Sequence, residues 1–71
     1  MKFNYSKLLG RIKECGYTQE TLSNKISCSE ATLSLKLNSR SFFEQRLMLE
    51  ICDVLNIRMD EIGAYFFCIE S

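Results

Sequence analysis

The sequence contains no histidine, and among its 71 residues there is no CxxC pair and no glycine-rich phosphate loop. Histidine is the most frequent general acid–base group, and no nucleophile stands near a plausible base. A zinc site normally takes two of its ligands from one tight turn. The sequence therefore predicts no enzyme, no metal site, no cofactor and no small-molecule ligand. The widely spaced cysteines are Cys15, Cys28, Cys52 and Cys68.

Long apolar runs are also missing. No stretch approaches the roughly 18 apolar residues of a membrane-spanning helix, and there is no basic-then-apolar N-terminal signal. These absences predict a cytoplasmic protein that does not bind membranes. Because thiols stay reduced in that compartment and each cysteine has apolar neighbours, we expect free, buried thiols rather than disulfides.

Proline is absent and only three glycines are present, whereas 46% of the residues are hydrophobic. This composition favours helices joined by short turns over many strands with tight hairpins. A chain of this length suffices for one hydrophobic core. We therefore predict an all-α fold, a compact bundle of about five short helices in a single domain over residues 1–71.

The first helix is predicted from apolar residues that recur every three or four positions, as on the inner face of an amphipathic helix. Gly16 is a suitable residue to end this helix. The apolar positions are Tyr5, Leu8, Leu9, Ile12 and Cys15.

Two N-cap candidates predict the next two helices. Thr18 would cap a helix over residues 19–26, and Ser29 a helix over residues 30–38, because each hydroxyl can accept from free backbone N–H groups of the following turn. The Ser-Cys-Ser break between them predicts a turn, with Cys28 packed against the core. Two short helices joined in this way form a helix-turn-helix arrangement. The inward side chains would be Leu22, Ile26, Leu33 and Leu37.

The rest of the chain predicts two further helices. The start of the fourth has two interpretations: Ser41 and Glu44 match a capping box, or Glu44 itself is the cap that follows the last loop residue. Asn56 can end this helix in a left-handed conformation. A short fifth helix over residues 59–64 would bury Ile62 and Met59. The inward residues of the fourth helix would be Met48, Ile51, Cys52 and Leu55.

Residues 62–69, IGAYFFCI, carry no charge. This segment either completes the core of the bundle or forms a surface for self-association, and both can hold for different side chains. The candidates for a dimer contact are Tyr65, Phe66, Phe67 and Ile69.

Residues 18–38, TQETLSNKISCSEATLSLKLN, resemble the Xre/Cro-like helix-turn-helix family. The wider pattern over residues 5–67 is similar to small phage-encoded Cro-like regulators. Ser27 stands where the family usually has the turn glycine, so it would have to adopt a left-handed conformation. Ser23 stands where the family usually has alanine.

The resemblance implies a homodimeric transcription regulator, of the repressor type, that reads a palindromic double-stranded DNA site with its third helix. Its base-reading positions map onto Ser29, Glu30, Ala31, Ser34, Leu35 and Asn38. A helical wheel with Leu33 inward also places Ala31 and Leu35 outward, where they suit thymine methyl groups. The expected phosphate contacts are Gln19, Thr32, Lys36 and Arg40.

The charges are unevenly distributed although their sum is zero. Residues 1–40 hold seven Lys and Arg against three Glu, whereas residues 41–71 hold two Arg against six acidic residues. The basic half is suited to face phosphate. The neutral total also supports an alternative hypothesis, a protein-interaction module such as an antirepressor that docks its apolar tail and acidic half on another regulator.

Overall fold

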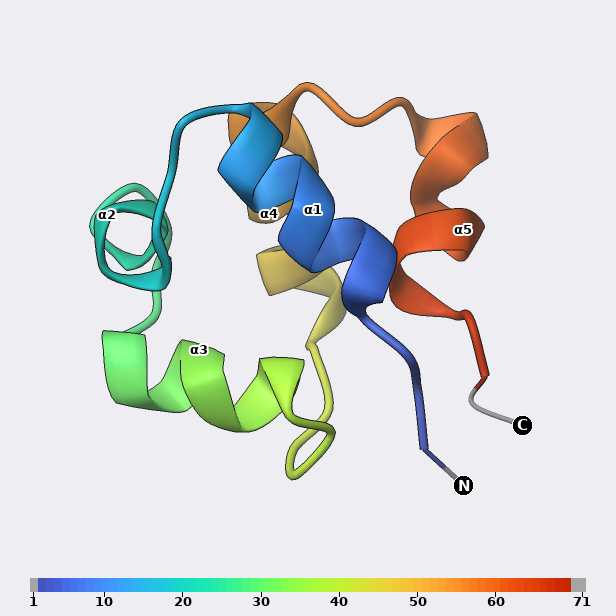
Figure 1. Ribbon diagram of the computed structural model, residues 1–71, viewed down its shortest axis with the longest axis horizontal. Coiled ribbons are helices and arrows are strands. Elements are labelled where there is room, and N and C mark those ends of the chain that lie inside the picture. Colours follow the sequence, from blue (N-terminus) through green and yellow to red (C-terminus); the bar gives the residue numbers. More distant parts are fainter. Residues whose placement is uncertain (1, 70–71) are drawn as a thin grey trace.

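Five short α-helices and one turn of 3-10 helix make up the computed structural model, which describes residues 2–69. This confirms the predicted all-α fold. In Figure 1, α1 crosses in front of α4, α5 stands beside them, and α3 lies across the base of the molecule. The elements are α1 (Ser6–Glu14), α2 (Gln19–Ser23), α3 (Glu30–Leu37), α4 (Gln45–Leu55), η1 (Met59–Glu61) and α5 (Ile62–Phe66).

One hydrophobic core receives side chains from all five α-helices. Aromatic rings extend this core beneath the connection between α3 and α4. The ring of Phe43 lies 5.3 Å from that of Tyr5 and 5.3 Å from that of Phe66, edge to face in both pairs. Because edge-to-face pairs are favourable, Phe43 fastens the end of this connection to the core. The fully buried side chains are Leu8, Leu22, Leu33, Ile51, Cys52, Leu55 and Phe66.

Gly16 ends α1 as predicted, with a φ of 82°. Its N–H donates to Lys13 O, and the N–H of Tyr17 donates to Ile12 O. These two bonds form a Schellman motif, which satisfies the last carbonyl groups of the helix.

The inner face of α1 is narrower than predicted. Leu8 and Ile12 are buried, whereas Leu9 is 40% exposed and Cys15 is exposed. Cys15 follows the last residue of the helix, and its thiol donates to Leu55 O at 3.7 Å. The expectation of four buried thiols is therefore wrong for Cys15, and also for Cys68 beyond α5, although all four cysteines are free.

The α4 helix begins at Gln45 with Glu44 as its N-cap residue in an extended conformation, so the second interpretation of its start is correct. It ends as predicted at Asn56, whose φ is 58°. The side chain of Arg11 reaches across from α1 and donates from Nε to Leu55 O at 3.1 Å. This bond fastens α1 to the C-terminal end of α4, where a cation is also favoured by the helix dipole.

Several predicted positions differ from the structure. The α2 helix ends at Ser23 rather than at residue 26, and Ile26 is only half-buried in the turns that follow. Met48 and Ile62 are half-buried, Leu47 is buried, and Met59 is 56% exposed. Each error lies near a helix end or at the edge of an apolar face, where spacing along the chain does not determine which neighbour covers the side chain.

Ser27 does not adopt the left-handed conformation expected where the family has glycine; among the non-glycine residues in the described range, only Ser39 and Asn56 have positive φ. Its N–H instead donates to the Glu50 carboxylate of α4 at 2.7 Å. The chain passes from α2 to α3 through consecutive turns, with Lys25 N–H donating to Leu22 O. A left-handed hinge is therefore not needed.

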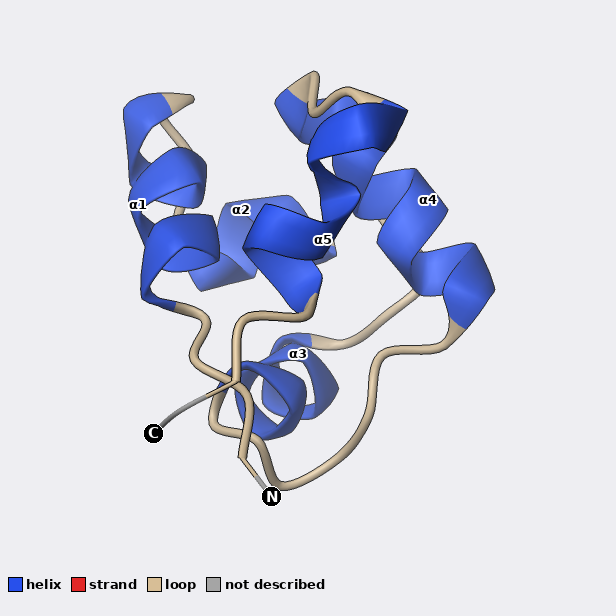
Figure 2. Cartoon of the chain, turned by 90° about the vertical axis from the view of Figure 1, so that its right-hand side faces the viewer, coloured by secondary structure: helices blue, strands red, loops and turns tan. Residues whose placement is uncertain are grey.

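The two ends of the described chain meet beside α3, as Figure 2 shows. Phe3 and Ile69 form an antiparallel bridge, and Asn4 N–H donates to Cys68 O at 2.6 Å. The hydroxyl of Ser39, just beyond α3, donates to Phe3 O at 2.7 Å. Within the described chain, none of the helices has both the length and the apolar character needed to cross a membrane.

Candidate functional site

The α2 and α3 helices each begin at the predicted capping residue. Thr18 Oγ1 accepts from Thr21 N–H at 3.1 Å, and Thr21 Oγ1 accepts from Thr18 N–H at 2.8 Å. Ser29 Oγ accepts from Thr32 N–H at 3.2 Å. These bonds satisfy N–H groups that have no partner inside the helix, so they determine where each helix starts.

The two helices pack at a steep angle. In Figure 1, α2 is viewed nearly along its axis while α3 lies across the page. Leu22 of α2 and Leu33 of α3 are both fully buried. The bond from Ser27 N–H to Glu50 connects the intervening turn to α4, and this bond lowers the pKa of the Glu50 carboxyl. The local geometry is the predicted helix-turn-helix, with the turn bonded to α4 through Glu50.

The predicted base-reading residues lie on α3 and at its two ends, where Ser29 is the N-cap and Asn38 the C-cap. Ala31 and Leu35 are exposed, as the helical wheel predicts, and Leu35 is 49% exposed. Ser34 is half-buried, and the side-chain amide of Asn38 donates to Ser34 O at 2.8 Å. Part of the hydrogen-bonding capacity of Asn38 is therefore used at the end of its own helix. The exposed members of the set are Ser29, Glu30, Ala31, Leu35 and Asn38.

Lys36 does not occupy the exposed position expected of a phosphate contact. It is only 4% exposed, and its ammonium donates to Phe42 O at 2.7 Å and to the Glu44 carboxylate at 2.6 Å. The reason is its place on the helix next to the buried Leu37 and three positions from Leu33, which brings its aliphatic stem over the core edge. Its partner Glu44 is eight positions away across a loop, and no local sequence pattern indicates that pairing.

Only one cation remains from the expected set of phosphate contacts. Arg40 is exposed, and its side chain forms none of the hydrogen bonds or ion pairs found in residues 2–69. Thr32 is exposed at the start of α3, and Gln19 is half-buried at the start of α2. Lys25, in the turn between the two helices, is an exposed cation that the sequence prediction omitted. Lys36 is thus removed from the predicted phosphate contacts, whereas Lys25 and Arg40 are exposed cations.

Phe42 is a second residue that the sequence prediction missed. Its side chain is 75% exposed, the highest value among the large apolar side chains of the described chain. The neighbouring Phe43 points into the core. The only signal in the sequence is a pair of adjacent phenylalanines in a polar connection, which does not indicate which ring is exposed.

The predicted dimer candidates differ in their exposure to solvent. Phe66 is 2% exposed and belongs to the core, so its assignment to a dimer contact is corrected. Tyr65 is half-buried, and the Lys7 ammonium lies 4.9 Å from the centre of its ring. Phe67 and Ile69 are 52% and 55% exposed. The core interpretation of the C-terminal segment therefore holds for Phe66, whereas self-association through Phe67 and Ile69 stays a prediction.

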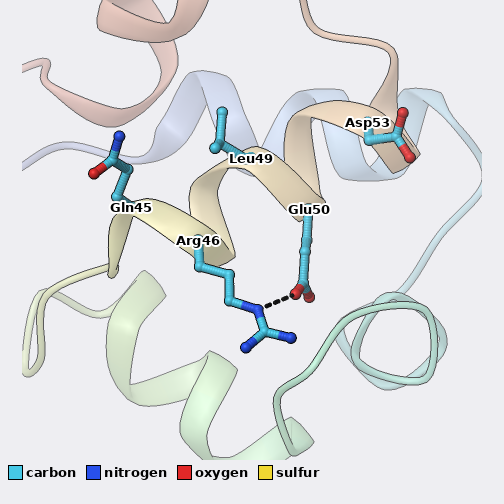
Figure 3. Close-up of a pocket in the computed structure, with 5 residues that line it drawn as sticks. All are labelled: Gln45, Arg46, Leu49, Glu50 and Asp53. Carbon is cyan, nitrogen blue, oxygen red and sulfur yellow. Dashed lines mark ion pairs between the residues drawn. The ribbon is translucent and has the colours of Figure 1, made fainter.

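A shallow hollow of about 530 Å³ lies along the outer side of α4 (Figure 3). All of its lining residues come from this one helix, and two of them, Arg46 and Glu50, pair at 3.4 Å. An open depression of this kind lacks the convergent polar groups from several elements that characterise small-molecule sites. Its lining consists of Gln45, Arg46, Leu49, Glu50 and Asp53.

Comparison with known proteins identifies the family. No curated protein matches this sequence. The chain is similar to the modulator of repression (MOR) of the temperate bacteriophage TP901-1 from Lactococcus lactis, known from a solution structure, with 37% sequence identity and a TM-score of 0.79 over 94% of this chain and 90% of that chain. The resemblance to a phage regulator is thereby confirmed, although the family that matches is not the Xre/Cro-like family. The matching family model, described as a protein of unknown function (DUF739), covers residues 1–68, so the chain belongs to the DUF739 family.

Proposed function

We propose that this chain modulates transcriptional repression by binding a repressor protein, with the exposed side of α3 as its contact surface. The observation that carries the proposal is its similarity, in sequence and in fold, to a phage protein named a modulator of repression. A small protein that regulates a repressor by binding must present a surface that the repressor can contact. Of the two helices of the helix-turn-helix, α3 has the longer exposed side.

The charges of α3 support a protein partner. The Lys36 ammonium is buried and paired with Glu44, so this helix presents Glu30 as its exposed charged side chain, together with the apolar Ala31 and Leu35. Affinity for DNA depends largely on lysine and arginine residues that neutralise phosphates. Protein interfaces, in contrast, are enriched in apolar centres with few charges. The surface around Leu35 resembles a protein interface in this respect, because it is apolar and carries few charges.

The proposal is tested by titrating the purified chain into the repressor encoded in the same phage or prophage genome, using calorimetry. We expect binding, and we expect the repressor to release its operator DNA as the chain is added. Leu35→Asp should weaken binding by at least tenfold because it places a charge in the centre of the contact. Leu9→Asp is the matched control, since Leu9 is 40% exposed on α1. Equal effects of the two substitutions would contradict a contact through α3.

A second candidate function is sequence-specific recognition of double-stranded DNA by the same helix. It is favoured by the capped α2 and α3 helices and by Arg40, which remains free to contact phosphate beside the exposed residues of α3. A symmetric DNA site would require a homodimer, for which Phe67 and Ile69 provide exposed apolar contacts.

Selection of binding sites from random DNA with the purified chain tests this second function. Leu35→Arg should change the selected bases, whereas Arg40→Ala should weaken all sites alike and reduce the slope of log affinity against log salt by about 1. A palindromic motif would indicate two copies of the chain on one site. Failure to enrich any motif, in a preparation that binds the repressor, would eliminate this candidate.

A further inference from the structure

Residues 38–44 connect α3 to α4, and we call this connection the Phe42 loop. It presents a phenyl ring to solvent in the connection that follows α3, where Phe42 is 75% exposed. Large aromatic side chains are usually withdrawn from water, and at protein interfaces they supply much of the binding energy. The hydrogen bonds and packing of the loop show whether the fold determines this exposed position of the ring.

The first half of the loop is fixed to the end of α3 and to the N-terminal segment. Arg40 N–H donates to Leu35 O at 2.9 Å, which closes the last turn of the helix. Ser39 adopts a left-handed conformation with a φ of 61°, uncommon for a residue other than glycine. Its hydroxyl donates to Phe3 O at 2.7 Å, so this conformation is held by a bond to a segment far away in the sequence.

The second half is fixed on both sides of the exposed ring. The carbonyl group of Phe42 accepts from the buried Lys36 ammonium at 2.7 Å, and the same ammonium pairs with Glu44 at 2.6 Å. The next residue, Phe43, packs edge-on between two core aromatic rings. A buried lysine, which is costly unless its charge is satisfied, thus holds the backbone of the most exposed apolar residue of the described chain. Contacts within the chain thus hold the backbone of the Phe42 loop on both sides of the ring.

We propose that Phe42 is the anchor residue that inserts into an apolar pocket of the partner repressor, an inference that rests on the proposed function above. Because contacts within the chain already hold the backbone of its loop, little backbone freedom is lost when the ring is buried, which favours affinity. The loop continues from the last turn of α3, so Phe42 and Leu35 can contribute to one apolar contact.

The charges near the Phe42 ring indicate which charge the partner should carry around its apolar pocket. The carboxylate of Glu44 is paired with Lys36, whereas the exposed Arg40 has no side-chain partner among the described residues. The loop is therefore left with one unpaired positive charge. A partner surface with an acidic side chain near the apolar pocket would complement it.

The test measures the affinity of four purified full-length chains for the purified repressor from the same genome: the wild type, Phe42→Ala, Phe42→Leu and Met59→Ala. Met59 is 56% exposed in η1 and is the matched control. We expect Phe42→Ala to weaken binding at least tenfold, Phe42→Leu to retain most of the affinity, and Met59→Ala to change it by less than twofold. Melting curves should be nearly unchanged for all the variants, because both side chains are exposed.

Arg40→Glu tests for an acidic side chain of the partner near its apolar pocket. Reversal of the charge should slow association and weaken binding, whereas Arg40→Lys keeps the charge and should do neither. Wild-type affinity in Phe42→Ala, with the wild type binding the repressor, would overturn this inference and leave the proposed function in place. Absence of binding by the wild type would overturn both. A lower molecular mass of Phe42→Ala than of the wild type in light scattering would show that the ring contacts a second copy of the chain, and would overturn the assignment to a repressor.

Discussion

The ammonium of Lys36 lies 2.6 Å from the carboxylate of Glu44, beneath the connection that follows α3. The side chain of Lys36 is 5% exposed and that of Glu44 is 68% exposed, so the pair is buried on one side and solvated on the other. This relationship removes a cation from the outer side of α3 and uses it to position the Phe42 loop. One pair thereby affects the fold, the charge of the contact surface and the presentation of Phe42.

Glu44→Ala should lower the free energy of unfolding by about 1–2 kcal/mol, because the buried ammonium then keeps only its bond to the Phe42 carbonyl. Urea unfolding at neutral pH followed by circular dichroism measures this change. The control is Glu61→Ala, which removes an exposed carboxylate that takes part in no ion pair of the described chain. A loss no larger than that of the control would contradict a structural role for the pair.

The Glu50 carboxylate should contribute to stability in a pH-dependent manner. Its bond from Ser27 N–H, with a smaller contribution from Arg46, lowers the pKa of the carboxyl in the folded chain. Stability from a lowered pKa is present above the unfolded value, about 4.3, and is lost as the pH falls through the folded value. Glu50→Gln should therefore be destabilising at pH 7, and the difference from the wild type should shrink at pH 3.

Asp53→Asn is the control for Glu50, because Asp53 lies on the same helix and its carboxylate receives no hydrogen bond within residues 2–69. Urea unfolding of the wild type and the two variants at both pH values gives the comparison. If the difference between Glu50→Gln and the wild type were the same at pH 3 and pH 7, the bond to Ser27 would not be the cause.

Two glycines of the first helix region should respond in opposite directions to alanine. Gly16 has a φ of 82°, so Gly16→Ala should destabilise the chain by about 1–2 kcal/mol through backbone strain. Gly10 lies inside α1, and a methyl group there would meet no atom within 4 Å. Gly10→Ala should therefore stabilise the chain by roughly 0.5–1 kcal/mol. Thermal melting of both variants measures these changes. If both substitutions shifted the melting temperature in the same direction, the assignment of strain to Gly16 would be contradicted.

The thiols should differ in their rate of reaction with a disulfide reagent. Cys15 and Cys68 are exposed, whereas Cys52 is buried and Cys28 is half-buried. Burial raises the pKa of the Cys52 and Cys28 thiols, which lowers the fraction of reactive thiolate. Mass spectrometry of the native chain after brief exposure should find Cys15 and Cys68 modified first. Early modification of Cys52 would show that α4 opens readily.

The sequence by itself determined the features that depend on a few neighbouring residues. Thr18 and Ser29 cap helices because their hydroxyl groups reach N–H groups three residues away. Gly16 and Asn56 end helices because they tolerate the left-handed conformation. Periodic apolar positions likewise identified Leu22 and Leu33 as core residues, and hence which side of α3 is exposed.

Only the tertiary structure decided which groups from distant parts of the chain meet. Glu44 neutralises Lys36, and Glu50 satisfies Ser27 N–H where a glycine was expected to be needed. Packing also decided which of two adjacent phenylalanines is buried. Phe43 and Phe66 pack in the core, whereas Phe42 and Phe67 are exposed. The physical reason is that burial and ion pairing depend on how helices pack in space, and spacing along the chain does not encode that packing.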